Sequence, residues 1–148
     1  MLLVVYVDDL LIAHNGAEGR GHWIKQLLQK KYKMCDLGAA KRLLGIEIER
    51  TKDDEGFSIC QRGYINTIIR RLGLMNAKPA KSPLDPQSDL ANTHCEDKPA
   101  NHKEYLSMVG SLMYAALGSR PDITFSVMAL SWYNVQPLEM HATAAKRV

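Results

Sequence analysis

The amino-acid sequence predicts an α+β protein, in which two β-hairpins with accompanying helices are followed by a mainly helical region. Strand-like apolar runs and alternation occur before residue 62, and apolar residues recur at helical spacing after residue 103. A chain of 148 residues suits one domain with a sizeable core. Its shares of 46% hydrophobic and 24% charged residues are near globular averages, so the chain is expected to fold.

The first stretch, Leu2–Ala13, reads LLVVYVDDLLIA and carries two adjacent carboxylates inside an apolar run. β-branched and aromatic residues precede Asp8 and Asp9, and apolar residues follow them, which is typical of two strands joined by a tight turn. We therefore expect a buried hairpin with the two acids at its tip. Because side chains alternate along extended backbone, the carboxylates should diverge unless a metal or a third group draws them together.

The chemistry of Asp8 and Asp9 indicates a metal site. An Asp-Asp pair lacks the glycine that tight hairpin turns favour, so turn formation alone is a poor reason for this pair. Hard cations take oxygen ligands, and paired Mg²⁺ ions about 3.5–4 Å apart clamp the attacking and leaving oxygens in nucleotidyl transfer. The alternative interpretation is an ordinary solvated turn, because short motifs often match by accident.

The next segment predicts a helix and then a second hairpin. Apolar residues at helical spacing over residues 23–32, with lysines between them, indicate an amphipathic helix with a basic outer face that starts near Ala17. Residues 45–51 alternate isoleucine with glutamate, as a half-buried strand does. A polar turn at 52–56 leads to a second strand at 57–60, which completes the hairpin.

The remaining sequence predicts four helices, with a proline-rich segment after the first. An apolar face opposite arginines predicts a helix over 61–73, and the prolines of 75–101 are typical of a linker where the chain would divide. Helices are then expected over 105–118, over 121–132 and from 137 onward. The helix at 121–132 is apolar nearly all round, so we expect it to be buried on most sides.

Charge and cysteine content narrow the setting of the protein. A net charge of +3 is a mild basic excess that matters only if the basic residues share one surface. Three widely spaced cysteines without a CxxC pair argue against a secreted disulfide framework and favour a reducing intracellular setting. The apolar opening is too short for a signal peptide or a membrane span. The histidines and cysteines lack zinc-ligand spacing, and His141 is interpreted as an exposed helix residue.

Four separated strings of the sequence share one order and spacing with a known family. They are YVDDLLIA at 6–13, DLG followed by LGIEIER within 36–50, YLSMVGSLMYAALGSRPDI at 105–123 and PLEMHATAAKRV at 137–148. Together they resemble the reverse transcriptase of copia-type retrotransposons over essentially the whole chain. The tetrad YVDD alone would be weak, whereas the tetrad with the RPD element and the LGI hairpin between them is specific.

The resemblance implies part of a polymerase palm followed by a helical thumb or connection region. The expected segments are a partial palm with two hairpins at 1–62, a thumb-like helix at 63–74, a proline-rich linker at 75–102 and a truncated helical thumb or connection segment at 103–148. The setting implied is intracellular, in the cytoplasm, a virus-like particle or the nucleus.

The resemblance also implies a catalytic site and its partners. Asp8 and Asp9 match the family's catalytic aspartates, which hold Mg²⁺ (or Mn²⁺), and Tyr6 and Val7 match residues that lie near the primer terminus. Four residues are further expected to contact primer–template: Gln61, Arg62, Arg70 and Arg71. In the complete enzyme the partners are an RNA/DNA primer–template and a dNTP, without a membrane, and the reaction is two-metal nucleotidyl transfer.

One departure from the family bears on activity. Family members carry fingers, an upper palm and a further metal-binding aspartate before the tetrad, and this sequence has none of them there. Two adjacent aspartates are too few to hold two divalent ions, and Asp36, Glu47 and Glu49 are interpreted as solvated. We therefore expect the isolated chain not to polymerise.

Two other functions remain open from the sequence. One is a non-catalytic nucleic-acid-binding or interaction domain, whose phosphate contacts would come from basic residues on two helices: Lys25, Lys30, Lys31, Lys33, Arg62, Arg70 and Arg71. The other is a decayed element remnant without a selected role. Such a remnant would expose apolar surface that fingers and upper palm cover in the family, and self-association would follow.

Overall fold

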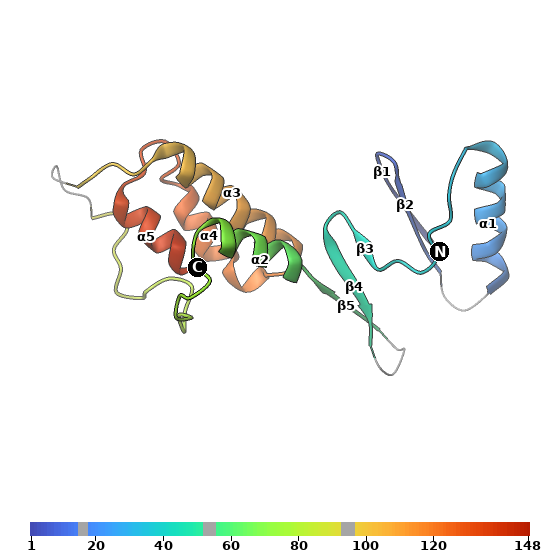
Figure 1. Cartoon of the computed structure of the whole chain (residues 1–148), viewed down its shortest axis with the longest axis horizontal. Coiled ribbons are helices and arrows are strands. Elements are labelled where there is room, and N and C mark those ends of the chain that lie inside the picture. The colour runs from blue at the N-terminus through green and yellow to red at the C-terminus, as the bar shows by residue number, and fades with distance from the viewer. Residues whose placement is uncertain (15–17, 52–55, 93–96) are drawn as a thin grey trace. The chain divides into compact units, whose positions relative to one another are not determined.

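A computed structural model describes residues 1–14, 18–51, 56–92 and 97–148 of the chain. It contains two compact units, Met1–Ile59 and Cys60–Val148, which we call the hairpin unit and the helical unit (Figure 1). Two small sheets and several helices make the chain mixed α and β, as predicted. In chain order the elements are β1 (Leu2–Tyr6), β2 (Asp9–Ala13), α1 (Glu18–Lys31), β3 (Arg42–Leu43), β4 (Ile46–Arg50), β5 (Phe57–Cys60), α2 (Arg62–Arg71), α3 (His102–Gly118), η1 (Pro121–Ile123), α4 (Thr124–Ser131) and α5 (Glu139–Arg147).

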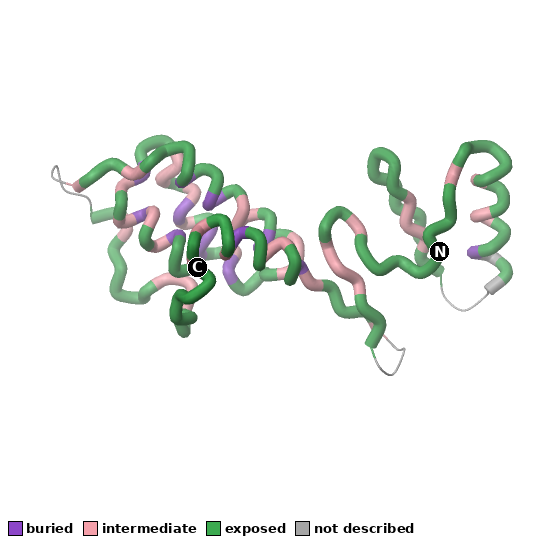
Figure 2. The backbone as a smooth tube through the Cα atoms, in the orientation of Figure 1, coloured by how far each residue is buried: buried purple, intermediate pink, exposed green. Residues whose placement is uncertain are grey.

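The hairpin unit has almost no buried interior (Figure 2). Gly21 is the one buried residue among those described between Met1 and Ile59. All five residues of β1 are exposed, although they are apolar. The prediction of a buried hairpin is therefore wrong for this chain, because a two-stranded sheet has too little surface to cover both of its own faces.

Helix α1 is tied to the loop that follows it by one ion pair. The ammonium of Lys25 lies 3.0 Å from a carboxylate oxygen of Asp36, and the other oxygen of Asp36 accepts a hydrogen bond from the Gly38 amide at 2.9 Å. These bonds lower the pKa of Asp36, the Gly38 amide being the larger cause and Lys25 the second. The amphipathic helix is confirmed as a helix, but Trp23 and Leu27 on its apolar face are exposed.

The second sheet contains the predicted hairpin and one strand that the sequence did not predict. The order is β3-β4-β5, and β4 and β5 lie where the alternation places them. Strand β3 joins β4 through a two-residue turn at Leu44 and Gly45, which have φ of 51° and 77°. A two-residue strand and a leucine in a left-handed turn leave no clear sequence signal. Most of the predicted polar turn at 52–56 lies outside the described residues.

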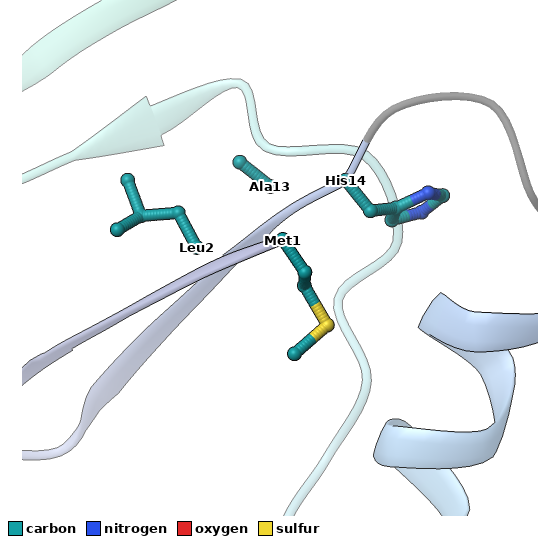
Figure 3. A pocket seen from close by; sticks show the side chains of 4 residues that line it. All are labelled: Met1, Leu2, Ala13 and His14. Atoms are coloured by element: carbon teal, nitrogen blue, oxygen red, sulfur yellow. The ribbon is translucent and has the colours of Figure 1, made fainter.

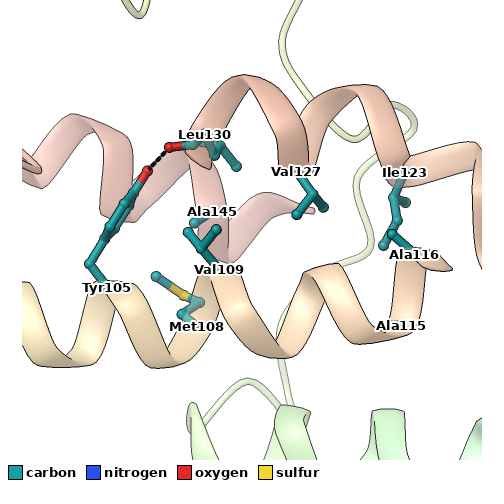
Figure 4. Packing of buried hydrophobic residues seen from close by; sticks show 9 residues of the cluster. All are labelled: Tyr105, Met108, Val109, Ala115, Ala116, Ile123, Val127, Leu130 and Ala145. Atoms are coloured by element: carbon teal, nitrogen blue, oxygen red, sulfur yellow. Dashed lines mark hydrogen bonds between the residues drawn. The ribbon is translucent and has the colours of Figure 1, made fainter. Parts of the chain in front are cut away.

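The core of the chain lies in the helical unit, where α3 packs against η1, α4 and α5 (Figure 4). Val127 and Leu130 of α4 are fully buried. The hydroxyl of Tyr105 donates a hydrogen bond of 2.7 Å to the carbonyl oxygen of Leu130, which joins α3 to α4. Complete burial of an aliphatic side chain stabilises a fold by about 1.5–3 kcal/mol, so the stability of the chain resides mainly in this unit.

The proline-rich segment belongs to the helical unit and does not separate two units. Leu84 and Leu90 pack against the core, and Pro99 forms an isolated β-bridge with Leu138. The expectation that the chain divides at 75–102 is thus not met, since the boundary between the two units falls between Ile59 and Cys60. Composition marks a segment that lacks regular structure, but it cannot show whether that segment is packed.

One expectation for the helical unit is met and another is corrected. Helix α4 is buried or half-buried except at Phe125 and Met128, so it is buried on most sides with one exposed face, and Trp132 just after the helix is exposed too. His141 on α5 is 1% exposed and not a surface residue. Within the described parts of the chain, no helix is both long and apolar enough to span a bilayer.

Candidate catalytic hairpin and nucleic-acid-binding residues

The turn of the first hairpin lies one residue earlier than the acid pair. Strands β1 and β2 pair antiparallel from Leu2 opposite Ala13 to Tyr6 opposite Asp9, so Val7 and Asp8 form a two-residue turn. Asp9 is therefore the first residue of β2, and only Asp8 occupies the tip. The prediction that both acids form the turn is corrected by this register, because adjacent apolar residues on both sides of the pair fit either register equally well.

Val7 holds a conformation that is unfavourable for its residue type. Its φ is 48°, in the left-handed region, where a β-branched side chain is a marked exception. Tight hairpin turns that need a positive φ at this position favour glycine. A strained residue of this kind costs about 1–3 kcal/mol and persists where the surrounding structure or a function requires it. The side chain of Val7 is also 83% exposed, so it does not stabilise the turn by burial.

Asp8 and Asp9 present their carboxylates at the acid end of an exposed hairpin. Among the described residues, no group of three or more His, Cys, Asp or Glu side chains lies close enough to hold a metal ion. The two aspartates are ligands of the type that Mg²⁺ prefers, because hard cations take carboxylate oxygens. Two carboxylates are too few to complete the coordination of the metal ions. They can supply part of a two-metal site, and the remaining ligands would have to come from outside the described residues.

The opposite end of the hairpin carries a shallow pocket lined by Met1, Leu2, Ala13 and His14 (Figure 3). A Cβ atom added to Gly21 of α1 would lie 2.5 Å from Nε2 of His14, so a larger residue there would displace this exposed imidazole. The pocket is at the end of the strands remote from Asp8 and does not extend the acid site.

The residues predicted to contact primer–template have different environments. Tyr6 is exposed beside the acid turn, and Arg62 and Arg70 are exposed on α2. Arg71 is exposed as well, but its Nη2 donates hydrogen bonds to Oγ of Ser111 at 2.6 Å and to the carbonyl oxygen of Ser107 at 3.5 Å. The acids belong to the hairpin unit and the arginines to the helical unit.

Gln61 differs from the other predicted contact residues because it is 1% exposed. Its Oε1 accepts a hydrogen bond of 2.9 Å from the hydroxyl of Ser119. A side chain enclosed in this way is not presented to a nucleic acid, which argues against the direct contact predicted for it. The sequence placed Gln61 correctly at the start of α2 but carried no signal that Ser119, 58 residues away, would bind it.

The RPD element forms a planar ion pair that sequence reasoning did not single out. The guanidinium of Arg120 donates to both carboxylate oxygens of Asp122, with distances of 2.7 to 3.1 Å. This pairing lowers the pKa of Asp122 and raises the pKa of Arg120. Both side chains are exposed, and the pair lies at the entry to η1, where Pro121 is the first residue. A bidentate pair fixes the guanidinium plane and stabilises this corner of the helical unit.

The chain is similar to several known proteins. Residues 1–86 match a family described as reverse transcriptase (RNA-dependent DNA polymerase). The chain is 36% identical over 151 residues to the retrovirus-related Pol polyprotein from transposon TNT 1-94 of Nicotiana tabacum, covering 99% of this chain and 11% of the relative. It is 34% identical over 146 residues to the corresponding polyprotein from transposon RE1 of Arabidopsis thaliana, covering 99% of this chain and 10% of the relative.

A shorter relative is also similar along the whole chain. A putative transposon Ty5-1 protein of Saccharomyces cerevisiae is 31% identical over 149 residues, covering 99% of this chain and 46% of the relative. No solved structure matches the chain. The chain therefore spans about a tenth of the length of the plant polyproteins and about half of the yeast protein.

Proposed function

The chain belongs to the reverse transcriptase (RNA-dependent DNA polymerase) family of copia-type transposon Pol polyproteins, and we propose that it supplies the aspartate hairpin and adjoining thumb-like helices of such a polymerase. The reaction of the complete enzyme is RNA-directed DNA synthesis by two-metal nucleotidyl transfer. Its partners are an RNA/DNA primer–template and a dNTP. In this assignment Asp8 and Asp9 are catalytic residues and metal ligands.

The observation that carries the proposal is the register of the first hairpin. Pairing of Tyr6 with Asp9 places Val7 and Asp8 in a two-residue turn, with both carboxylates accessible at one end of the sheet. Val7 adopts its unfavourable φ of 48° at this same point. Strained backbone at an exposed pair of carboxylates supports a site that is held for binding and not for stability.

Asp8 and Asp9 would hold Mg²⁺ (or Mn²⁺) through their carboxylate oxygens. The metal ions would stabilise the negative charge that develops on the attacking and leaving oxygens. The exposed phenol of Tyr6 and the side chain of Val7 would lie beside the primer terminus. Tyr6 ends β1 and Val7 is the first residue of the turn, so each is within three residues of a ligating carboxylate, which suits this role.

We further infer that this chain by itself does not polymerise. Two carboxylates leave a two-metal site short of ligands, and the described residues offer no third acid near them. The carboxylate of Asp36, one alternative ligand, is already held by Lys25 and the Gly38 amide. A complete site would need carboxylates contributed by another segment of the polyprotein.

The exposed arginines of α2 suit contact with nucleic-acid phosphates. Arg62 and Arg70 are exposed, and α2 ends in two arginines without an acidic residue in its first turn. Each phosphate neutralised by an arginine releases counterions, so such contacts would weaken as salt rises. Arg71 would act with part of its guanidinium, since one of its nitrogens already binds Ser111.

A chimeric enzyme tests the proposal. The 148-residue chain replaces the matching region of the tobacco relative, and primer extension is measured with Mg²⁺. Asp8→Asn and Asp9→Asn should each lower the extension rate by more than about a hundredfold, because each removes a metal ligand. Glu49→Gln, which removes an exposed carboxylate from β4, is the matched control and should leave the rate unchanged.

The separate 148-residue chain is measured in parallel. It should show no extension above a buffer blank. Full activity of the Asp8→Asn chimera would overturn the catalytic assignment, and extension by the separate chain that disappears with Asp8→Asn would overturn the inference that it is inactive.

A second candidate function rests on the basic residues that are exposed at the ends of two helices. Lys30 and Lys31 occupy the last turn of α1, and Arg70 and Arg71 the last turn of α2. A nucleic-acid-binding domain without catalysis would use these side chains alone. Affinity for a primer–template duplex that falls steeply with salt and is unchanged by Asp8→Asn would favour this candidate, and absence of binding at low salt would exclude it.

A further inference from the structure

Gln61 is the single residue that joins strand β5 to helix α2. Its carbonyl oxygen accepts a hydrogen bond of 2.9 Å from the Ile65 amide, which is a hydrogen bond of the first turn of α2. Its side chain is enclosed in the helical unit and accepts the 2.9 Å hydrogen bond from Ser119, just after the end of α3. The side chain therefore connects the first turn of α2 to the end of α3.

Gly118 provides the space that Gln61 occupies. A Cβ atom at residue 118 would lie 2.5 Å from Oε1, 2.7 Å from Cδ and 2.7 Å from Nε2 of Gln61. Distances below 3.0 Å are essentially never adopted by real Cβ atoms, so any larger residue at 118 must displace the amide. Gly118 is the last residue of α3, and no positive φ explains a glycine there. The close approach of Gln61 is the physical reason for it.

The amide of Gln61 is not an optimal choice for stability. Its Nε2 is buried and has no hydrogen-bond partner among the described residues. An unpaired buried donor destabilises the fold, and an apolar side chain of similar size would avoid this cost. A directional hydrogen bond, unlike an apolar contact, fixes the position of both partners. The amide of Gln61 therefore fixes its own position relative to Ser119.

We propose that Gln61, Gly118 and Ser119 form an interlock that positions the start of α2 for binding of primer–template. Gln61 is in this view a positioning residue and does not touch the nucleic acid itself. Displacement of its backbone would shift Arg62, the next residue and the first of α2. This inference rests on the proposed function for its role in primer–template binding, whereas the interlock itself does not depend on that function.

A melting experiment on the full 148-residue chain tests the interlock. Replacement of glycine by alanine within a helix normally stabilises the helix, because glycine loses more conformational freedom on folding. Gly110→Ala should follow this rule and raise Tm, because nothing lies within 4 Å of a Cβ atom at that exposed position of α3. Gly118→Ala should instead lower Tm by about 5 °C or more, because it forces the Gln61 amide aside.

A second substitution should reverse the sign of the Gly118→Ala effect. In a Gln61→Ala background the obstructing amide is absent, so adding Gly118→Ala should leave Tm unchanged or raise it. Equal effects of Gly118→Ala in both backgrounds, or a rise in Tm in the original background, would overturn the interlock.

The chimeric enzyme tests positioning with Gln61→Met, which keeps the side-chain volume and removes the hydrogen bond from Ser119. Its Tm in the 148-residue chain should be unchanged or higher, because the unpaired amide is removed. In the chimera, KM for primer–template should rise about fivefold to tenfold with kcat changed less than about twofold, the pattern of lost ground-state binding. An unchanged KM would overturn the positioning role.

The two proposals fail in different ways. Loss of activity with Asp8→Asn addresses the catalytic assignment alone, and the melting cycle addresses the interlock alone. If the unsubstituted chimera is inactive, the proposed function is contradicted, and the interlock is still decided by the sign of the Gly118→Ala effect.

Discussion

His141 donates a hydrogen bond of 3.0 Å from Nε2 to the carbonyl oxygen of Leu90, which lies 51 residues earlier in the chain. Its other ring nitrogen, Nδ1, accepts a hydrogen bond of 3.0 Å from the Leu138 amide at the start of α5. The imidazole also stacks on Tyr133, with ring centroids 3.9 Å apart. One buried side chain thus joins the proline-rich segment, the start of α5 and the residues after α4.

His141→Ala should therefore loosen the proline-rich segment. The substitution leaves the Leu138 amide and the Leu90 carbonyl without their partner and opens a cavity beside Tyr133, at a cost of about 2–4 kcal/mol. Limited proteolysis should show faster cleavage within residues 82–92, together with a lower Tm. His22→Ala, at an exposed position of α1, is the control. Unchanged cleavage in the His141 variant would contradict this role.

Tyr105→Phe should destabilise the helical unit by about 1 kcal/mol, because it removes the buried hydrogen bond to the Leu130 carbonyl. Thermal unfolding followed by circular dichroism measures the change. Tyr32→Phe, at an exposed position outside this unit, should have no effect on the same transition. A Tyr105 variant as stable as the original chain would show that the hydrogen bond is not needed.

The same tyrosine predicts a pH dependence at alkaline pH. Burial, and to a lesser extent the neighbouring Tyr133, raises the pKa of Tyr105 to about 12 from its ordinary value of 10.0. A raised pKa in the folded state gives stability that is complete below pH 10 and is lost as the pH rises from about 10 to about 12. Urea unfolding across this range should show a steeper loss for the original chain than for Tyr105→Phe. Identical slopes would contradict the prediction.

The ion pair between Lys25 and Asp36 predicts a change in one carboxylate. In Lys25→Ala the pKa of Asp36 should rise towards its ordinary value, but only part of the way, because the larger cause of the shift, the Gly38 amide, remains. The lowered pKa in the folded state gives stability that is present above the ordinary value and lost as the pH falls through the lowered one. NMR titration of the Asp36 side chain, in the original chain and in Lys25→Ala, measures this pKa. A pKa of Asp36 unaffected by Lys25→Ala would contradict the ion pair.

The exposed hairpin predicts self-association. Strand β1 presents apolar side chains, and the outer edge of a two-stranded sheet offers unpaired backbone groups to another strand. Sedimentation velocity over a concentration series should show oligomers, and Val5→Lys should reduce them by adding a charge to the exposed strand. Ser58→Lys places the same charge on an exposed residue of β5 as a control. A monomer at every concentration would contradict the prediction.

The hairpins and helices could be predicted from local sequence because each has its own period. Alternation placed β4 and β5, and apolar spacing placed α2 and α3 to within a few residues. The end of α2 was marked by Gly73, whose φ of 69° is the left-handed conformation that commonly follows a helix. The hairpin turn at Asp8 was displaced by one residue, because uniform apolar strands do not specify their register.

The candidate site could be predicted only in part. Asp8 and Asp9 were apparent from two acids in an apolar run, and their order relative to the later motifs indicated the family. The positions of Gln61 at the N-terminal end of α2 and of Arg71 in its last turn were also correct, but their surroundings were not predictable. Each binds a serine of α3 or of its C-terminal end, 58 and 40 residues away, and no local pattern records such a pair.

The sequence by itself determined the family, most of the secondary structure and the acid pair, because these depend on residue type and short spacing. The tertiary structure alone decided what covers each face. It buried His141 and Gln61, left the apolar strand β1 and one face of α4 exposed, and packed the proline-rich segment on the core. An apolar period shows which face of an element prefers to be covered, but whether another element covers it depends on contacts between residues far apart in the chain.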